Sequence, residues 1–104
     1  MTLSKFNVTL PTLDTAGNAL TTGEITSLVF VVNGNSYAAT VAANTAPGAA
    51  LVVPFASLLP PFVPGSAVYT ADVYAVDANG NGTPSASISF NTAVPAAPTG
   101  FSVG

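Results

Sequence analysis

Five side chains carry all the formal charge of this sequence, and any acid–base chemistry would have to be built from them. The chain has no His, no Cys and no Arg, and its charged residues are Lys5, Asp14, Glu24, Asp72 and Asp77. General acid–base catalysis needs a group whose pKa lies near the operating pH, a role that His fills most often. Asp72 and Asp77 lie five positions apart on a predicted strand, so they face opposite sides and do not form a pair. We therefore expect no enzymatic activity and no cofactor.

One short motif has the oxygen ligands of a metal site. The run D-A-N-G-N-G, residues 77–82, is similar to the first half of an EF-hand calcium loop. The twelfth position, however, is Ile88, where that loop needs a bidentate Glu. Asn-Gly pairs are also typical of tight hairpin turns. A turn and a weak calcium site are both compatible with the motif; we favour the turn and predict no metal site.

The charge content is low for a soluble domain. Only 5% of the residues are charged, against an average of about 25%, and residues 25–71 contain none. Nucleic-acid binding is not expected, because phosphate contacts need several cations. Surfaces with so little charge repel one another weakly and tend to associate. Two interpretations follow: a low-charge domain of extracellular type, or a subunit whose surface is largely covered by neighbours.

The termini and the proline-rich middle bear on location. The first ten residues have no apolar core of a signal peptide, so either the protein is used without export or a leader has been removed. Residues 46–64 form the longest uncharged apolar-rich run, but five prolines within it exclude a membrane helix. We therefore predict no membrane insertion. The absence of Cys also excludes a disulfide framework.

The hydrophobic pattern predicts strands throughout and no helix. Asn33-Gly34 is a strong hairpin signal between two of these strands. The 50–55 run contains Pro54, which favours an edge strand. Short strands with regular turn signals indicate an antiparallel sandwich of about seven strands over residues 1–93. The predicted strands are 6–10, 25–32, 36–42, 50–55, 68–77 and 85–90.

The longest predicted strand has an apolar outer stripe. Residues 69, 71, 73 and 75 are expected to face the core, which places Val68, Tyr74 and Val76 on the other face. Exposed apolar residues on one face suggest contact with a partner. The alternative is that the second sheet covers this face and the assignment is inverted.

Residues 63–92 resemble the last two strands of a fibronectin type III domain. The resemblance implies that Tyr69 is a tyrosine corner, whose hydroxyl bonds to the backbone at the preceding Pro64-Gly65. The chain departs from the family in having no Trp, so the wider immunoglobulin-like group fits equally well. The matching residues are Pro64, Gly65, Tyr69, Val73, Ala75, Asp77, Gly80, Asn81, Ser85 and Thr92.

The family's first strand typically reads A-P-x-x-F-x-V, and that pattern stands near residue 100 of this chain. Pro95 and Pro98 mark residues 94–104 as a proline-rich linker with a strand-like C-terminal arm, whose partner-binding candidates are Pro98, Phe101 and Val103. Three interpretations remain: the arm completes a neighbouring subunit by strand addition, it folds back onto its own sheet, or it is the remnant of a tandem linker.

Immunoglobulin-like and fibronectin type III-like modules are familiar on bacteriophage virions and on bacterial surfaces. The resemblance and the neutral surface together favour a non-enzymatic virion component, a capsid decoration or fibre protein made in the host cytoplasm. Its partners would be the capsid shell or copies of itself, in a homo-oligomer or larger assembly. The alternatives are an adhesive or carbohydrate-binding accessory module of a secreted bacterial protein at the cell surface, and a self-polymerising surface filament.

Overall fold

The structure is a computed structural model that describes residues 3–65, 67–91 and 96–104. About 42% of it is strand and 3% is helical, the latter a single short turn, η1 (Phe55–Ser57). Seven strands are present in the described residues, and they form two antiparallel sheets. This confirms the expected all-β, antiparallel chain of about seven strands.

The smaller sheet has two strands, β1 (Lys5–Thr9) and β4 (Ala50–Pro54). They pair antiparallel with Phe6 opposite Val53, and both of these side chains are buried. Polar residues alternate with apolar ones along β1, so one face of the strand packs inward and the other meets solvent.

The larger sheet is built around one central pair of strands. Its order is β3 (Asn35–Thr40), β2 (Ser27–Val32), β5 (Val68–Asp77), with the far edge of β5 shared by β6 (Gly80–Asn81) and β7 (Ile88–Asn91). Since β2 lies between two partners, its backbone is hydrogen-bonded on both sides, and its residues alternate between buried and half-buried.

The turn between β2 and β3 has the geometry that its sequence predicts. Asn33 and Gly34 both have positive φ, at 48° and 83°, as a two-residue hairpin of the primed type requires. The Asn33 side-chain oxygen also accepts a hydrogen bond from the Thr70 N–H at 2.9 Å. The turn is thereby attached to β5 as well as to its own hairpin.

The two sheets share one hydrophobic core, and aromatic rings fill its centre. The Phe6 ring from the small sheet stacks on the Phe30 ring of β2, with centroids 4.7 Å apart. It also meets the rings of Phe55 at 4.7 Å, Phe62 at 6.3 Å and Phe90 at 5.8 Å. We call these five rings the phenylalanine cluster. It occupies the centre of a core that contains no Trp.

The strand β5 has the bounds and the inward face expected from the sequence. Ala71 is buried, and Tyr69, Val73 and Ala75 pack against the core. Val68, Tyr74 and Val76 therefore lie on the outer face of β5, as expected, and the inverted assignment is wrong.

The predicted strand 85–90 is shorter than expected. β7 begins only at Ile88, because Ser85 pairs with β5 through its side chain as well as its backbone. The Ser85 N–H donates to the Val73 carbonyl at 2.8 Å, while the Ser85 hydroxyl accepts from the Val73 N–H at 3.0 Å. If the register of β5 and β7 continued, Ala86 would lie opposite Val73 and its carbonyl would accept that bond. The alternation of small and apolar residues in the sequence did not reveal that a side-chain hydroxyl replaces a backbone carbonyl here.

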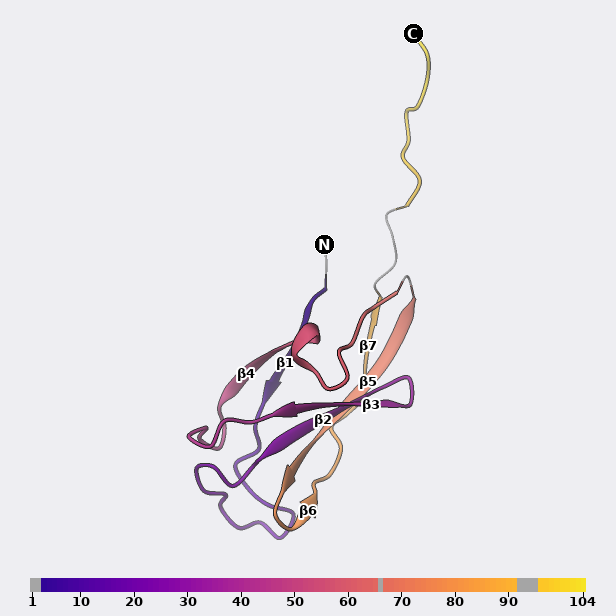
Figure 1. Cartoon of the computed structure of the whole chain (residues 1–104). Helices are drawn as coiled ribbons and strands as arrows, with labels where there is room; N and C mark the ends of the chain where they lie inside the picture. Colours follow the sequence, from indigo (N-terminus) through magenta and orange to yellow (C-terminus); the bar gives the residue numbers. More distant parts are fainter. Residues whose placement is uncertain (1–2, 66, 92–95) are drawn as a thin grey trace.

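Residues 96–104 extend away from the two sheets (Figure 1). They lack regular secondary structure, and together with the sheets they give the chain extents of 69 × 24 × 24 Å. Thr92, which the resemblance matched, and Pro95 of the expected linker lie outside the described residues. Among the described residues, the structure contains no helix with the length and hydropathy of a membrane span.

The phenylalanine cluster predicts a sharp contrast between two phenylalanines. Phe6→Ala should lower the free energy of unfolding by about 3–5 kcal/mol, because it empties the centre of the core. Phe101→Ala is the matched control and should change it by less than about 0.5 kcal/mol, since Phe101 is exposed. Urea unfolding of dilute protein, followed by circular dichroism, measures both. Equal losses would show that the cluster does not hold the sheets together.

Candidate interaction site

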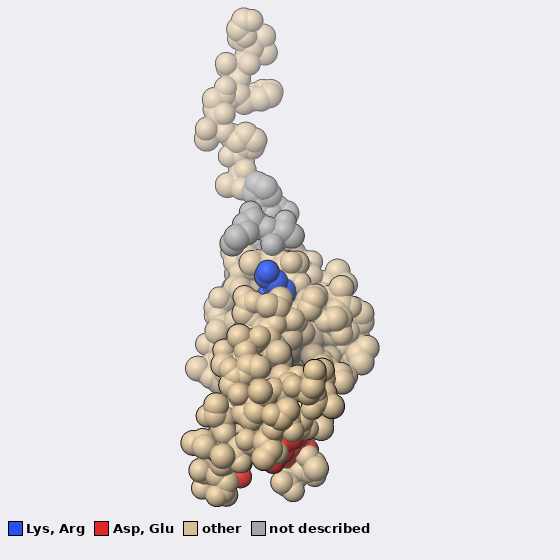
Figure 2. All heavy atoms as spheres, turned by 90° about the vertical axis from the view of Figure 1, so that its left-hand side faces the viewer, with Lys and Arg blue, Asp and Glu red and all other residues tan. Residues whose placement is uncertain are grey.

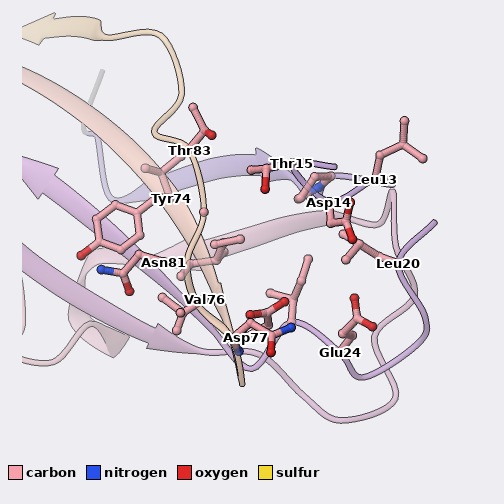
Figure 3. Close-up of a pocket in the computed structure, with 18 of the residues that line it drawn as sticks. Leu13, Asp14, Thr15, Leu20, Glu24, Tyr74, Val76, Asp77, Asn81 and Thr83 are labelled. Atoms are coloured by element: carbon pink, nitrogen blue, oxygen red, sulfur yellow. Dashed lines mark hydrogen bonds between the residues drawn. The ribbon is translucent and has the colours of Figure 1, made fainter. Parts of the chain in front are cut away.

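Four of the five charged side chains lie at opposite ends of the molecule, and Asp72 lies in the middle of β5. Lys5 stands on β1 at the end from which the arm leaves, and red acidic atoms gather at the other end (Figure 2). Asp14, Glu24 and Asp77 line one hollow at that acidic end (Figure 3). In the described part of the chain, no three Asp, Glu, His or Cys residues are grouped closely enough to hold a metal ion.

Two of the acidic side chains are used to hold loops. The Asp14 carboxylate accepts hydrogen bonds from the N–H groups of Ala16 and Asn18, each at 2.9 Å. The Asp77 carboxylate accepts one from the Asn79 N–H at 2.8 Å, inside the turn that leads to β6. In D-A-N-G-N-G the first oxygen ligand of a calcium loop is thus engaged as a turn acceptor.

The hollow at the acidic end has a volume of about 670 Å³. The end of β1, the 11–20 loop, the second half of β5 and the 79–85 segment line it. Its walls carry Val8, Leu20 and Val76 beside the three carboxylates and several Thr and Asn side chains, so the lining is mixed polar and apolar. The carboxylates that line the hollow at positions 14 and 77 are engaged by backbone N–H groups of their own loops.

One edge of the small sheet is open. Ser4 accepts a hydrogen bond from Phe55, and Leu10 donates one to Ala49, so the even-numbered backbone groups of β1 face β4. The N–H and C=O groups of Lys5, Asn7 and Thr9 therefore face the other way. Within the described residues no strand pairs with that side of β1. We call it the free edge.

In the described residues the outer edge of β4 is unpaired as well, but it is partly protected. On β4 the outward-facing position 54 is a proline, which has no N–H to offer an added strand. After η1 the chain crosses to the larger sheet, where Leu59 and Ala38 exchange backbone hydrogen bonds of 2.9 and 3.0 Å. This bridge covers part of the outer edge of β3, so the two sheets are joined here and open at the free edge.

An inward-facing side chain is left uncovered at the open side. Ile88 lies opposite Ala71 in the register of β5 and β7, so both point to the inner face. Ala71 is buried, yet Ile88 is 56% exposed. An isoleucine on an inner face would normally be covered, and no described strand covers this one; we call the space beside Ile88 the gap.

The predicted contact residues of β5 are only partly brought together. Val68 is 64% exposed, whereas Tyr74 and Val76 are half-buried and line the hollow. The arm residues Phe101 and Val103 are 95% and 97% exposed, and the arm extends away from the sheets (Figure 1). Pro98 is likewise exposed.

The residues that the resemblance assigned to the corner are in contact. The Gly65 N–H donates to the Tyr69 hydroxyl at 2.8 Å, and Pro64 before it is half-buried. Sequence reasoning missed the free edge and Ile88, since the pairing partner of a strand is not encoded in the strand's own pattern. The signal available was the resemblance of residues 97–103 to a first strand.

Models of known protein families, curated proteins and solved structures were compared with the chain, and none of them matches it.

The Tyr69 hydroxyl gives a stability prediction. Tyr69→Phe should lower the free energy of unfolding by about 1 kcal/mol, because it leaves the Gly65 N–H without this acceptor. Tyr37→Phe is the control, since the Tyr37 hydroxyl has no hydrogen bond in the described part of the chain and its ring packs on Phe62 at 5.3 Å. Urea titration of both variants measures the difference. A Tyr69→Phe variant as stable as the control would contradict a structural role for the corner.

Asp14 predicts a pH dependence. The Asn18 N–H chiefly, with those of Ala16 and Gly17, lowers the pKa of Asp14 below its ordinary value of 3.8. The stability that Asp14 contributes is therefore present above that ordinary pKa and is lost as the pH falls through the lowered value. NMR titration should show the Asp14 carboxyl titrating at lower pH in the folded chain than in urea. The same carboxyl titrating at 3.8 or above in the folded chain would contradict it.

Proposed function

We propose that this chain is an immunoglobulin-like or fibronectin type III-like sandwich that serves as a non-enzymatic structural subunit. The sheet orders β1-β4 and β3-β2-β5-β7, with the Tyr69 hydroxyl held at the preceding corner, support the fold assignment. The assembly proposed is a bacteriophage virion, in which the chain would be a capsid decoration or fibre protein. The subunit would bind its neighbours through shape-complementary surfaces, neutral polar contacts and strand pairing.

A single observation carries the structural role. The molecule has an unpaired strand edge beside an uncovered Ile88, on a surface with almost no charge to keep copies apart. Soluble monomers usually protect such edges with charges, prolines or a covering loop. Only Lys5 offers that protection on β1, so a neighbouring molecule is the proposed cover.

The aromatic residues favour assembly over carbohydrate binding. An adhesive module for sugars would need an exposed aromatic platform. All nine aromatic residues of the chain lie among the described residues, and Phe101 is the only one of them that is exposed. Tyr37 and Tyr69 pack against Phe62, and Tyr74 is half-buried. A lone phenylalanine on an extended arm is not a platform.

Self-association is the test. Light scattering behind size exclusion, over a concentration series, should give a mass that rises with concentration. The association should survive about 1 M salt, where the Debye length falls to about 3 Å, because neutral contacts are not screened. A single monomeric species at every concentration would contradict the proposal.

A further inference from the structure

The free edge and the gap beside it define what could complete them. The edge presents the backbone groups of Lys5, Asn7 and Thr9, which an added strand would satisfy. Two inward-facing side chains are incompletely covered on these strands, the half-buried Val8 of β1 and the exposed Ile88 of β7. A matching segment would therefore be extended, about as long as β1, and apolar at every second residue.

Residues 98–104 of this chain have those properties. Phe101 and Val103 alternate with Ser102 and glycines, which is a strand pattern with one apolar face. Both apolar side chains are almost fully exposed where they stand, and Pro98 precedes them at a position that a strand end tolerates. Residues 98–104 thus have the sequence pattern of an apolar strand without a sheet, and β1 has a sheet edge without a strand.

The arm's own molecule is a poor acceptor. The Phe6 and Phe90 rings are 5.8 Å apart, so the arm leaves β7 at the end where β1 begins and would run parallel to β1. Antiparallel pairing is slightly more stable, and every strand pair in the described residues uses it. To pair antiparallel with β1 of its own molecule, the arm would first have to run about 17 Å to the far end of β1 and cross about 10 Å between the sheets. Residues 92–97 extend at most about 21 Å, which leaves none for the reversal.

The charges favour a second copy placed head to tail. An arm that enters from the acidic end and runs antiparallel to β1 brings the donor's Lys5 end toward the acceptor's Asp14, Glu24 and Asp77. An arm that enters from the other end would run parallel and bring two Lys5 ends together. Strand direction and charge thus select the same arrangement.

We propose that the free edge of β1 receives residues 98–104 of a second copy of this chain as an added antiparallel strand. Phe101 and Val103 would enter the gap beside Ile88. This inference rests on the proposed function as an assembly subunit, and it names the partner and the contact. Because the donated and accepting surfaces differ, the association is heterologous and builds a ring or an open filament.

Cross-linking between full-length single-cysteine variants tests the contact, and the natural chain has no Cys to interfere. Ser102→Cys is mixed under oxidising conditions with Asn7→Cys or Thr9→Cys. These residues lie beside the proposed pairing, where neighbouring Cα atoms are within disulfide reach. Each mixed dimer can form only between two molecules. We expect several-fold more mixed dimer than with Val52→Cys, an exposed residue on the outer side of β4 and the register partner of Asn7.

A matched pair of prolines tests the backbone contact. The N–H groups of Asn7 and Val52 face away from the β1–β4 ladder on opposite sides, so proline at either position spares that ladder. Asn7→Pro should abolish association, and Val52→Pro should leave it intact. Circular dichroism checks that both remain folded, and the cross-linking result stands alone if either does not.

The outcomes of light scattering and cross-linking distinguish strand donation from the proposed assembly role on which it rests. Oligomers by light scattering, with no preference for Asn7 or Thr9 over Val52 in cross-linking, would overturn strand donation and keep the assembly role. A Ser102→Cys, Asn7→Cys double variant that closes only within one chain would overturn it in favour of fold-back. Monomers at every concentration, without mixed dimers, would overturn both.

Discussion

The contact of the Phe6 ring with the larger sheet is the constraint on which the rest of the structure depends. β1 and β4 form only a two-stranded sheet, and such a pair is marginal in water without something to pack on. Phe6 supplies that packing by stacking on Phe30 and meeting the rings of Phe55, Phe62 and Phe90. These rings fix the smaller sheet over the larger one, and so they also place the free edge and the gap beside Ile88.

The two sides of the molecule are finished differently. On one side Pro54 removes a donor from β4, and the bridge between Leu59 and Ala38 joins the sheets. On the other side β1 keeps its outward N–H and C=O groups, and Ile88 stays exposed. Proline at position 54 makes the outer edge of β4 a poorer acceptor of an added strand than the free edge of β1. This asymmetry supports an ordered assembly over random aggregation.

Local sequence patterns predicted the strands and turns well, but they did not predict which distant strands pair. The bounds and inward face of β5 and the turn at Asn33-Gly34 follow from alternation and from glycine's tolerance of positive φ. The start of β7 could not be predicted, because the Ser85 hydroxyl takes the place of a backbone group. The free edge escaped for a related reason. It is defined by the neighbour that β1 lacks, and only the resemblance of residues 97–103 to a first strand pointed toward it.

The direction of β1 has a mechanical consequence. β1 runs along the length of the molecule, and the arm leaves from one end of the same axis (Figure 1). In the proposed head-to-tail assembly, a pull between neighbouring subunits would act along the paired strands. Tension would load all the hydrogen bonds of the pairing at once, in shear, and would not peel them apart one by one. A joint of this kind resists stretching far better than bending, whatever its equilibrium affinity.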